Sequence, residues 1–358
     1  MTIHVTINGK PCSFDVQPGE RVKELLQRNG FLSVRNGCDG HGSCGNCAIL
    51  VDGRMANSCL LLAPQIDGKC LITAEGLSQG RKLHPIQSAF IDAGIVQCGY
   101  CTTAMELAVR TLLEKNLDPG REEIKDALSG IFCRCTGYEQ VFKAVKLAAA
   151  RLKSEKEEEI APSFAEDLRV IGKPKGKVDG SMLSRGEAAF VEDMVKPGSL
   201  HVKMLWSPHA HAIIEEIDTS EAEKIPGVVY ILTQKNSPDL FYSSAGQGYP
   251  EPSPYDRRLM DKKVRYVGDR VAAVAAESIE IAQQAIEKIR VRYNVLPPVL
   301  SLEEAARENA PVIHDRDASI DPLHLGAEPL KNIAAQNSGG IGDLAKGFAE
   351  ADVTIERT

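Results

Sequence analysis

The sequence predicts an α+β multidomain protein, and three observations support that prediction. First, the chain has 358 residues, which suggests two or three domains rather than one. Second, the spacing of apolar residues changes along the chain, from alternation near the N-terminus to helical stripes after residue 83 and a mixture of both after residue 170. Third, eight of the ten cysteines form two compact sets between Cys38 and Cys135.

Residues 1–78 are predicted to form a small unit of strands and one helix. The segments IHVTI and PCSFDV alternate apolar and polar residues around the turn NGK, which is typical of a hairpin. An amphipathic helix follows in ERVKELLQRNG and ends at Gly30. From Cys47 on, CAILVDGRMANSC predicts a strand, a turn at Asp52-Gly53 and a return strand, and KCLITAEG predicts a last strand.

Residues 79–152 are predicted to form a bundle of four helices. Pro85 stands where the first turn of a helix accepts proline. MELAVRTLLEK and YEQVFKAVKLAAARLK each place apolar residues on one helical stripe, and REEIKDALSG supplies a further helix between them. Residues 153–169 are charged and poor in large apolar side chains, so they are predicted to be an exposed linker.

Residues 170–315 are predicted to form an α/β layer. The strand candidates are LHVKML, GVVYILT, RVAAVAAE and RVRYNVL. Between the last two, SIEIAQQAIEKI predicts a helix capped by Ser278, with one apolar face made of Ile279, Ala282, Ile286 and Ile289. Near the end of the sequence, FAEADVTIERT predicts a strand in which Val353 and Ile355 alternate, and an unpaired strand suggests a continuation or a partner chain.

The composition excludes some classes of function. A formal net charge of -7 argues against a nucleic-acid-binding surface, which needs clustered Lys and Arg. The first residues lack the layout of a signal peptide, and no apolar run approaches the roughly 20 residues that cross a bilayer. We therefore expect a cytoplasmic protein without a membrane or nucleic-acid partner. Structural disulfides are rare in that compartment, so metal binding is the leading interpretation of the cysteines.

The first cysteine set lies in and after the glycine-rich stretch CDGHGSCGNC. Plant-type [2Fe-2S] ferredoxins use a similar loop, with the spacing C-x4-C-x2-C and a distant fourth cysteine. Glycines suit such a loop because short segments must turn their N–H groups inward toward the cluster, and Gly40, Gly42 and Gly45 allow those conformations. Here the first interval contains five residues rather than four. The predicted ligands are Cys38, Cys44, Cys47 and Cys59.

The second set consists of the motifs QCGYC and FCRC, and each motif precedes a predicted helix. Thiolates at helix N-termini are stabilised by the helix dipole and by free N–H groups. Two such helices side by side would close four sulfurs around one centre, with Cys98, Cys101, Cys133 and Cys135 as ligands. A structural zinc site remains an alternative for this set, because four-cysteine sites are common zinc sites. Cys12 and Cys70 stand in strand patterns and are predicted to be buried apolar residues.

These motifs resemble a known family. CGNCAILVDGRMANSCLLLA is similar to the plant-type iron-sulfur domain, and VQCGYCT with FCRCTGYEQV to the helical iron-sulfur domain, of the xanthine dehydrogenase and aldehyde oxidase family of molybdenum hydroxylases. The segments LHVKMLWSPHAHAIIEEIDTSEAEKIPGVVYILT and KVRYVGDRVAAVAAE resemble its α/β hammerhead domain. The resemblance covers nearly the whole chain apart from the linker. It implies a β-grasp ferredoxin domain at 1–78, a four-helix [2Fe-2S] bundle at 79–152, a hammerhead domain at 170–315 and the start of a molybdopterin-binding domain at 316–358.

The resemblance also implies cofactors and roles. The two cysteine sets would hold two [2Fe-2S] clusters, and Gln97 matches a glutamine that hydrogen-bonds the molybdopterin. The alternative for Gln97 is an ordinary polar residue that caps a helix. The family's CTPG is replaced here by Cys101-Thr102-Thr103-Ala104, which would alter only the start of a helix. The linker is too short for a flavin domain, so FAD would belong to another subunit.

The family's catalytic glutamate lies in a region that follows the end of this sequence, so no catalytic residue is expected within it. The chain is expected to be an electron-transfer subunit, or the N-terminal segment of a longer chain. It would pass electrons from the molybdenum-binding catalytic part, through both clusters, to a flavin subunit or another acceptor. The substrate would be a purine, another N-heterocycle or an aldehyde. A free-standing two-cluster redox carrier is the competing interpretation.

Three other features are weaker. His209 and His211 would share one face of a strand and could be half of a metal site, although a structural role is favoured. The glycines at 339, 340 and 342 lack the strand and lysine of a phosphate-binding loop and indicate a turn. The proline-rich stretch 245–256 is predicted to be an exposed loop that could also border an interface.

Overall fold

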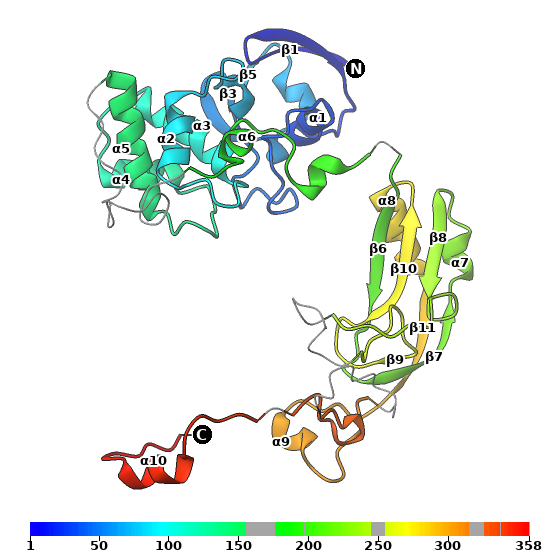
Figure 1. The fold of residues 1–358 in the computed structure, drawn as a ribbon. Helices are drawn as coiled ribbons and strands as arrows, with labels where there is room; N and C mark the ends of the chain where they lie inside the picture. Colours follow the sequence, from blue (N-terminus) through cyan, green and yellow to red (C-terminus); the bar gives the residue numbers. More distant parts are fainter. Residues whose placement is uncertain (155–175, 197, 245–254, 315–325, 337, 358) are drawn as a thin grey trace. The chain divides into compact units, whose positions relative to one another are not determined.

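The protein is described here by a computed structural model that covers residues 1–358 except for 155–175, 197, 245–254, 315–325, 337 and 358. The chain forms two compact units, residues 1–195 and residues 196–358 (Figure 1). Most of the predicted linker 153–169 and of the predicted loop 245–256 lies outside the described residues.

The N-terminal part of the first unit contains a five-stranded sheet with the strand order β2-β1-β5-β3-β4. The strands and the helix beside them are β1 Thr2–Ile7, β2 Lys10–Asp15, α1 Val22–Arg28, β3 Ala48–Val51, β4 Arg54–Asn57 and β5 Cys70–Ile72. β1 pairs parallel with β5, and the other pairs are antiparallel. The predicted hairpin turns are confirmed, since Asn8 and Gly9 have φ of 51° and 78° and Asp52 and Gly53 have 48° and 78°.

The core of this sheet follows from the alternation of its strands. Ile3, Val5 and Ile7 on β1 pack with Leu25 and Leu26 of α1, and all five are buried. Cys70 was predicted to be buried, but it is exposed. The reason is the two-residue period of a strand, because Leu71 faces the core and its neighbour therefore faces the other side. Cys12 is half-buried.

The four predicted helices are present. They are α2 Pro85–Asp92, α3 Thr102–Leu113, α4 Arg121–Leu128 and α5 Glu139–Lys153. Their stripes meet in one core, to which α3 contributes Met105 and Val109 and α5 contributes Val141 and Val145. Members of the second cysteine set lie near the N-termini of two helices. Cys101 is the N-cap residue of α3, and Cys133 and Cys135 lie in the loop before α5.

Residues 176–195 pack on this same unit. They contain the short helix α6 Gly180–Ser184 and the 3-10 turn η4 Val191–Met194. Leu183 of α6 is buried in the core of the four helices. The predicted domain limits remain predictions, but the packing joins this part of the chain to the cysteine-bearing unit (Figure 1).

The second unit contains two three-stranded sheets, in the orders β6-β10-β8 and β11-β7-β9. The four predicted strands are confirmed as β6 His201–Trp206, β8 Val228–Thr233, β10 Arg270–Ala276 and β11 Arg290–Val295. The sequence prediction missed β7 Ala212–Asp218 and β9 Lys263–Val264, and the short helix α7 Ser220–Glu223. β10 and β11 belong to different sheets, so they do not form the single layer that their strand-helix-strand order suggested. The strand pairs among the described residues of this unit are antiparallel.

The predicted helix between those strands is α8 Ile279–Lys288, and the Ser278 hydroxyl accepts the Ile281 N–H at 3.2 Å. Its buried face differs slightly from the prediction. Ala282 and Ala285, in the middle of the helix, are fully buried, whereas Ile279 in its first turn is 37% exposed.

The last described part of the chain contains α9 Leu302–Ala305, the turn η5 Pro329–Lys331 and α10 Leu344–Glu350. The predicted strand after α10 is wrong. Val353 and Ile355 are each 77% exposed, and among the described residues no strand lies beside them to supply hydrogen bonds.

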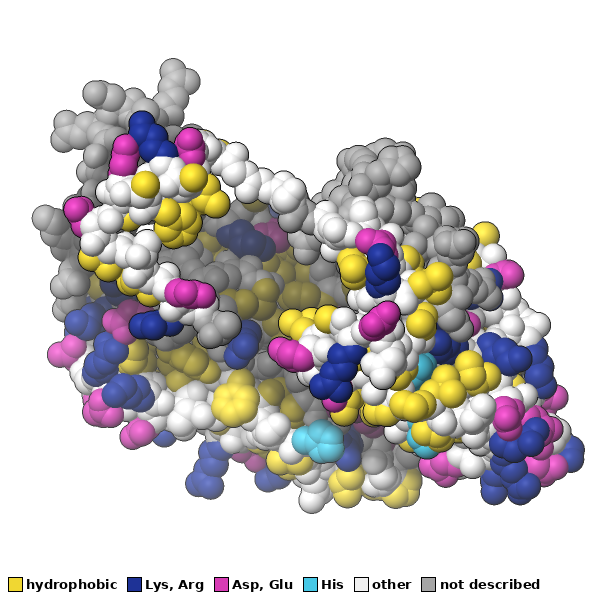
Figure 2. Space-filling model, turned by 90° about the horizontal axis from the view of Figure 1, so that it is seen from below, with side chains coloured by type: hydrophobic (Ala, Val, Ile, Leu, Met, Phe, Trp, Pro, Cys, Tyr) yellow, Lys and Arg dark blue, Asp and Glu magenta, His cyan; other side chains and the backbone are white. Residues whose placement is uncertain are grey.

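The surface mixes charges of both signs. On the face drawn in Figure 2, Lys and Arg side chains are interspersed with Asp and Glu side chains. None of the helices in the described ranges is long and apolar enough to cross a bilayer.

Candidate iron-sulfur centres

The loop between α1 and β3 brings the first cysteine set together with Cys59, which follows β4. Cys44, Cys47 and Cys59 are buried, and Cys38 is half-buried. The thiols lie in two pairs, with Cys38 beside Cys44 and Cys59 beside Cys47. The two pairs are close enough for Cys38 to influence the ionisation of Cys59.

The glycines of this loop adopt the conformations that the sequence predicted. Gly40, Gly42 and Gly45 have positive φ values of 79°, 75° and 70°. At Gly45 the requirement is also steric, because a Cβ atom there would overlap the Gly130 carbonyl oxygen and lie 2.9 Å from its carbonyl carbon. At Gly37 a Cβ atom would lie 3.1 Å from the Cys44 sulfur. The backbone therefore approaches the thiols closely, as a loop that wraps a compact cluster must.

The second set is assembled from the start of α3 and the loop before α5. Its thiols also lie in two pairs, Cys101 with Cys133 and Cys98 with Cys135. Cys101 is buried, whereas Cys98 and Cys135 are exposed. Tyr138 fixes the loop, since its hydroxyl accepts the Cys133 N–H and donates to the Ile131 carbonyl, both at 2.8 Å.

The ionisation of these thiols is uneven. Desolvation opposes ionisation of Cys38, but hydrogen bonds from Cys44 and Ser43 outweigh it and lower its pKa to about 6. Burial, aided by the neighbouring Cys47 thiol, raises the pKa of Cys59 to about 11. Burial and the nearby Cys133 thiol raise the pKa of Cys101 well above its usual value. Four adjacent thiolates are thus unfavourable without a compensating cation, which a metal centre provides.

The arrangement of the thiols can be compared with the ligand geometry of a structural zinc site and of a [2Fe-2S] cluster. A structural zinc ion needs four ligands converging on one point. Two pairs of thiols fit a [2Fe-2S] cluster instead, because four cysteines share its two irons. The donor chemistry and the glycine-lined loop therefore fit two such clusters.

Two hydrogen bonds join the loops of the two sets. The N–H of Phe132, the residue before Cys133, donates to the Cys44 carbonyl at 2.9 Å. The N–H of Asn36, two residues before Cys38, donates to the Tyr100 hydroxyl at 3.1 Å. Tyr100 stands between Cys98 and Cys101. No local sequence pattern indicates this role for Tyr100, because the contact joins residues 64 positions apart.

Gln97 lies at the exposed side of the second set. Its side chain is exposed, and its N–H donates to the Ile95 carbonyl at 2.8 Å. The alternative role as a helix cap is not what the structure shows, because α3 begins at Thr102 with Cys101 as its N-cap residue.

His209 and His211 make structural contacts, which is the role that the sequence analysis favoured. They lie in the bend between β6 and β7, so the strand on which the metal-site alternative depended is absent there. His211 Nδ1 lies 2.7 Å from the Pro297 carbonyl, and the His209 ring packs edge-on against Tyr293. Both histidines thus have structural contacts within the second unit.

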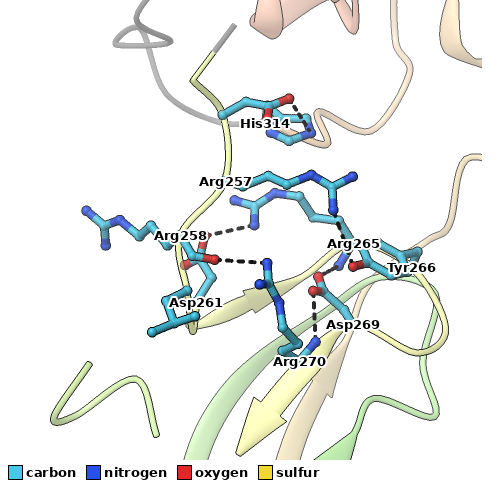
Figure 3. Close-up of a pocket in the computed structure, with 10 residues that line it drawn as sticks. Arg257, Arg258, Asp261, Arg265, Tyr266, Asp269, Arg270 and His314 are labelled. Carbon is cyan, nitrogen blue, oxygen red and sulfur yellow. Dashed lines mark hydrogen bonds and ion pairs between the residues drawn. The ribbon is translucent and has the colours of Figure 1, made fainter. Parts of the chain in front are cut away.

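A cluster of charged and polar side chains surrounds a cavity of about 70 Å³ near β9 and β10 in the second unit (Figure 3). Its arginines make specific contacts, such as Arg265 Nη1 to Asp261 Oδ2 at 2.8 Å and Arg270 Nη1 to Tyr242 Oη at 2.5 Å. These contacts cross-link the loops of the second unit, and no cysteine lines the cavity.

Three family models match the chain. They are described as the 2Fe-2S iron-sulfur cluster binding domain over residues 5–73, the [2Fe-2S] binding domain over 73–146, and the aldehyde oxidase and xanthine dehydrogenase a/b hammerhead domain over 185–297. The two iron-sulfur matches contain all eight cysteines of the two sets.

Curated relatives agree with these matches. A protein named "Probable hypoxanthine oxidase XdhD" from Escherichia coli K12 is 45% identical over 100% of this chain and 40% of its own length. An aldehyde oxidoreductase from Megalodesulfovibrio gigas is 31% identical over 98% of this chain and 39% of its own length. The chain thus spans about 40% of these relatives. The nicotinate dehydrogenase small FeS subunit of Eubacterium barkeri is 42% identical, and 96% of it is covered by 42% of this chain.

A solved structure is also similar. The aldehyde oxidoreductase from Desulfovibrio gigas superimposes with a TM-score of 0.75 and 32% identity, over 88% of this chain and 36% of that chain. The matched domains, their order and the identities to these relatives agree. The chain belongs to the xanthine dehydrogenase and aldehyde oxidase family of molybdenum hydroxylases.

Proposed function

We propose that this chain is the electron-transfer segment of a molybdenum hydroxylase. The observation that carries the proposal is the presence of two four-thiol sets, each arranged as two pairs, in one unit. Cys98, Cys101, Cys133 and Cys135 would hold one [2Fe-2S] cluster, and Cys38, Cys44, Cys47 and Cys59 the other. When bound, the clusters supply one-electron carriers.

The chain's own residues give each cluster its surroundings. The first set, in which three of the four cysteines are buried, is enclosed by the glycine loop. The hydrogen bond between Phe132 and Cys44 connects the two sites. The second set has two exposed cysteines and the exposed Gln97 beside them. This face would meet the molybdopterin, and the Gln97 amide offers donors and an acceptor to a pterin edge. Electrons would then pass from the second set to the first.

In this proposal, substrate oxidation belongs to a molybdenum-binding catalytic part, either on a separate polypeptide or in a longer parent chain. The relatives that match the whole chain are about two and a half times longer, and their printed names include a hypoxanthine oxidase and an aldehyde oxidoreductase. We propose a purine, another N-heterocycle or an aldehyde as the substrate class. We further propose that FAD, where it takes part, is bound by a separate subunit, and that the protein works in the cytoplasm, where its free thiols would stay reduced.

Elemental analysis of the natively purified protein tests the proposal. We expect about four irons per chain, two for each cluster, with molybdenum in the same particle. Zinc in place of iron would refute the redox function. The same iron content without molybdenum would support a separate two-cluster carrier instead. EPR of the reduced protein should show two distinguishable cluster signals, and a single signal would contradict the assignment of two sites.

A further inference from the structure

A fully buried arginine stands three residues before Cys38. The Arg35 side chain is 2% exposed, and Arg35 is among the largest fully buried side chains of the chain. A buried guanidinium is always charged, so it must be compensated by carboxylates and hydrogen bonds. Those compensating groups come from residues 187–193, about 150 positions along the sequence.

The contacts of Arg35 are specific. Nη1 lies 2.5 Å from Asp193 Oδ1 and 3.6 Å from Glu192 Oε1, and Nη2 lies 3.5 Å from the Glu187 carbonyl. The guanidinium also lies over the Phe190 ring at 4.5 Å. Asp193 is itself held, because its other oxygen accepts the N–H groups of Ala189 and Phe190 at 2.9 and 3.0 Å. The acceptor carboxylate is thus held by two backbone N–H groups as well as by Arg35.

The same segment reaches the second cysteine set through Tyr100. The Tyr100 hydroxyl donates to Glu192 Oε2 at 3.1 Å while it accepts the Asn36 N–H. Its ring packs edge-on against Phe190, with centroids 5.1 Å apart, and lies 6.0 Å from the Arg35 guanidinium. One cluster of side chains therefore contacts the loop before Cys38 and the loop between Cys98 and Cys101.

The beginning of the segment is anchored to the helices. The carbonyl of Ser184 accepts Gln87 Nε2 at 2.9 Å, and its hydroxyl hydrogen-bonds the buried Glu106. Leu183 packs on Gly99, where an added Cβ atom would lie 2.9 Å from its side chain. Residues 180–193, called the bridging segment below, thus contact both halves of the cysteine-bearing unit.

We infer that Arg35 is a positioning residue for electron transfer between the two clusters, and that with the bridging segment it fixes the separation of the two cysteine loops. This inference rests on the proposed function. Apolar packing alone would bury the same surface, but apolar side chains let the bridging segment shift along the two cysteine loops at little cost. A buried guanidinium held at once by the Asp193 carboxylate, the Glu187 carbonyl and the Phe190 ring fixes direction as well as distance. The rate of electron transfer falls steeply with distance, so a fixed separation has a functional consequence.

The test measures the separation of the clusters directly. In the reduced full chain, the magnetic interaction between the two clusters splits their EPR signals by an amount that depends on their distance. We expect Arg35→Met and Asp193→Asn to change or lose this splitting while the iron content stays at the wild-type value. Arg35→Lys, which keeps the charge, should restore part of it. The matched control is Arg151→Met, because Arg151 is also largely buried and pairs with Asp92, at 2.7 Å, but joins α5 to α2 instead.

Tyr100→Phe is a second, milder variant that keeps the inference testable if Arg35→Met fails to fold. It removes only the hydroxyl that joins Asn36 to Glu192, and we expect a smaller change of splitting in the same direction. Unchanged splitting in iron-loaded Arg35→Met and Tyr100→Phe would overturn the inference. A wild-type chain without two clusters would refute the proposed function itself, so the two failures are distinguishable.

Discussion

The contact between Gly45 and Gly130 gives the sharpest prediction about the centre of the cysteine-bearing unit. Replacing Gly45 by alanine adds a Cβ atom that overlaps the Gly130 carbonyl oxygen and lies 3.1 Å from Ile131 Cα. The backbone also has a φ of 70°, a conformation that costs an alanine about 1–2 kcal/mol. The overlap adds the cost of overpacking, about 1–3 kcal/mol. We expect a total loss of about 2–5 kcal/mol, a large part of the roughly 5–15 kcal/mol that stabilises a domain.

Gly53→Ala separates the two contributions. Gly53 has a similar φ of 78°, but an added Cβ atom would have nothing within 4 Å. Urea unfolding of both variants in the iron-loaded form gives their stabilities, and the difference between them measures the overlap. Gly45→Ala should also lower the iron content. The added Cβ atom would displace residues 130–132 and break the hydrogen bond from the Phe132 N–H to the carbonyl of Cys44, a proposed cluster ligand. Equal stability of the two variants would refute the close approach of the two loops.

Three further predictions concern individual side chains. Cys135→Ser should remove one EPR signal and leave the other, and loss of both would show that the sites are not independent. Burial, against hydrogen bonds from Ser184 and Gln87, raises the pKa of Glu106 well above its ordinary 4.5. The folded state then holds a proton that the unfolded state releases above pH 4.5, so stability should fall as pH rises, by about 1.4 kcal/mol per unit until the folded pKa is reached. Glu106→Gln should flatten this slope in urea unfolding between pH 5.5 and 7.5, and an equal slope in both proteins would count against a buried neutral carboxyl. Gln97→Ala should keep both clusters but reduce the molybdenum retained by the purified particle; unchanged molybdenum would exclude a role for this amide in pterin binding.

Locally encoded features were predictable from the sequence. Asn8-Gly9 and Asp52-Gly53 can adopt the positive φ values that a tight hairpin needs, so the turns were visible without any tertiary information. Pro85 and Ser278 likewise mark helix starts through their own chemistry. The cysteine spacing predicted two sets, and the structure places the members of each set beside one another, while their role as ligands stays a proposal.

Features that depend on distant partners were not predictable. The burial of Arg35 contradicts the rule that charged residues stay exposed, and it depends on Asp193, 158 positions away. No local pattern around either residue announces that pair. The strand expected at His209 and His211 failed for a related reason, because contacts with Pro297 and Tyr293 hold that segment in a bend. The local propensity of a segment indicates which secondary structures it can form, and tertiary contacts determine which of them is present in the fold.

The extra residue in the first cysteine loop is the sequence's clearest departure from the ferredoxin spacing, and the structure shows how it is accommodated. The chain turns tightly after Cys38, where the His41 N–H donates to the Cys38 carbonyl at 3.1 Å and Asp39 has a φ of 51°. The side chains of Asp39 and His41 point into solvent. Part of the five-residue interval thus forms an exposed turn, and the Cys38 thiol lies beside Cys44. A five-residue interval is thus compatible with Cys38 as a cluster ligand, because a surface turn can absorb one residue without moving the two sulfurs apart.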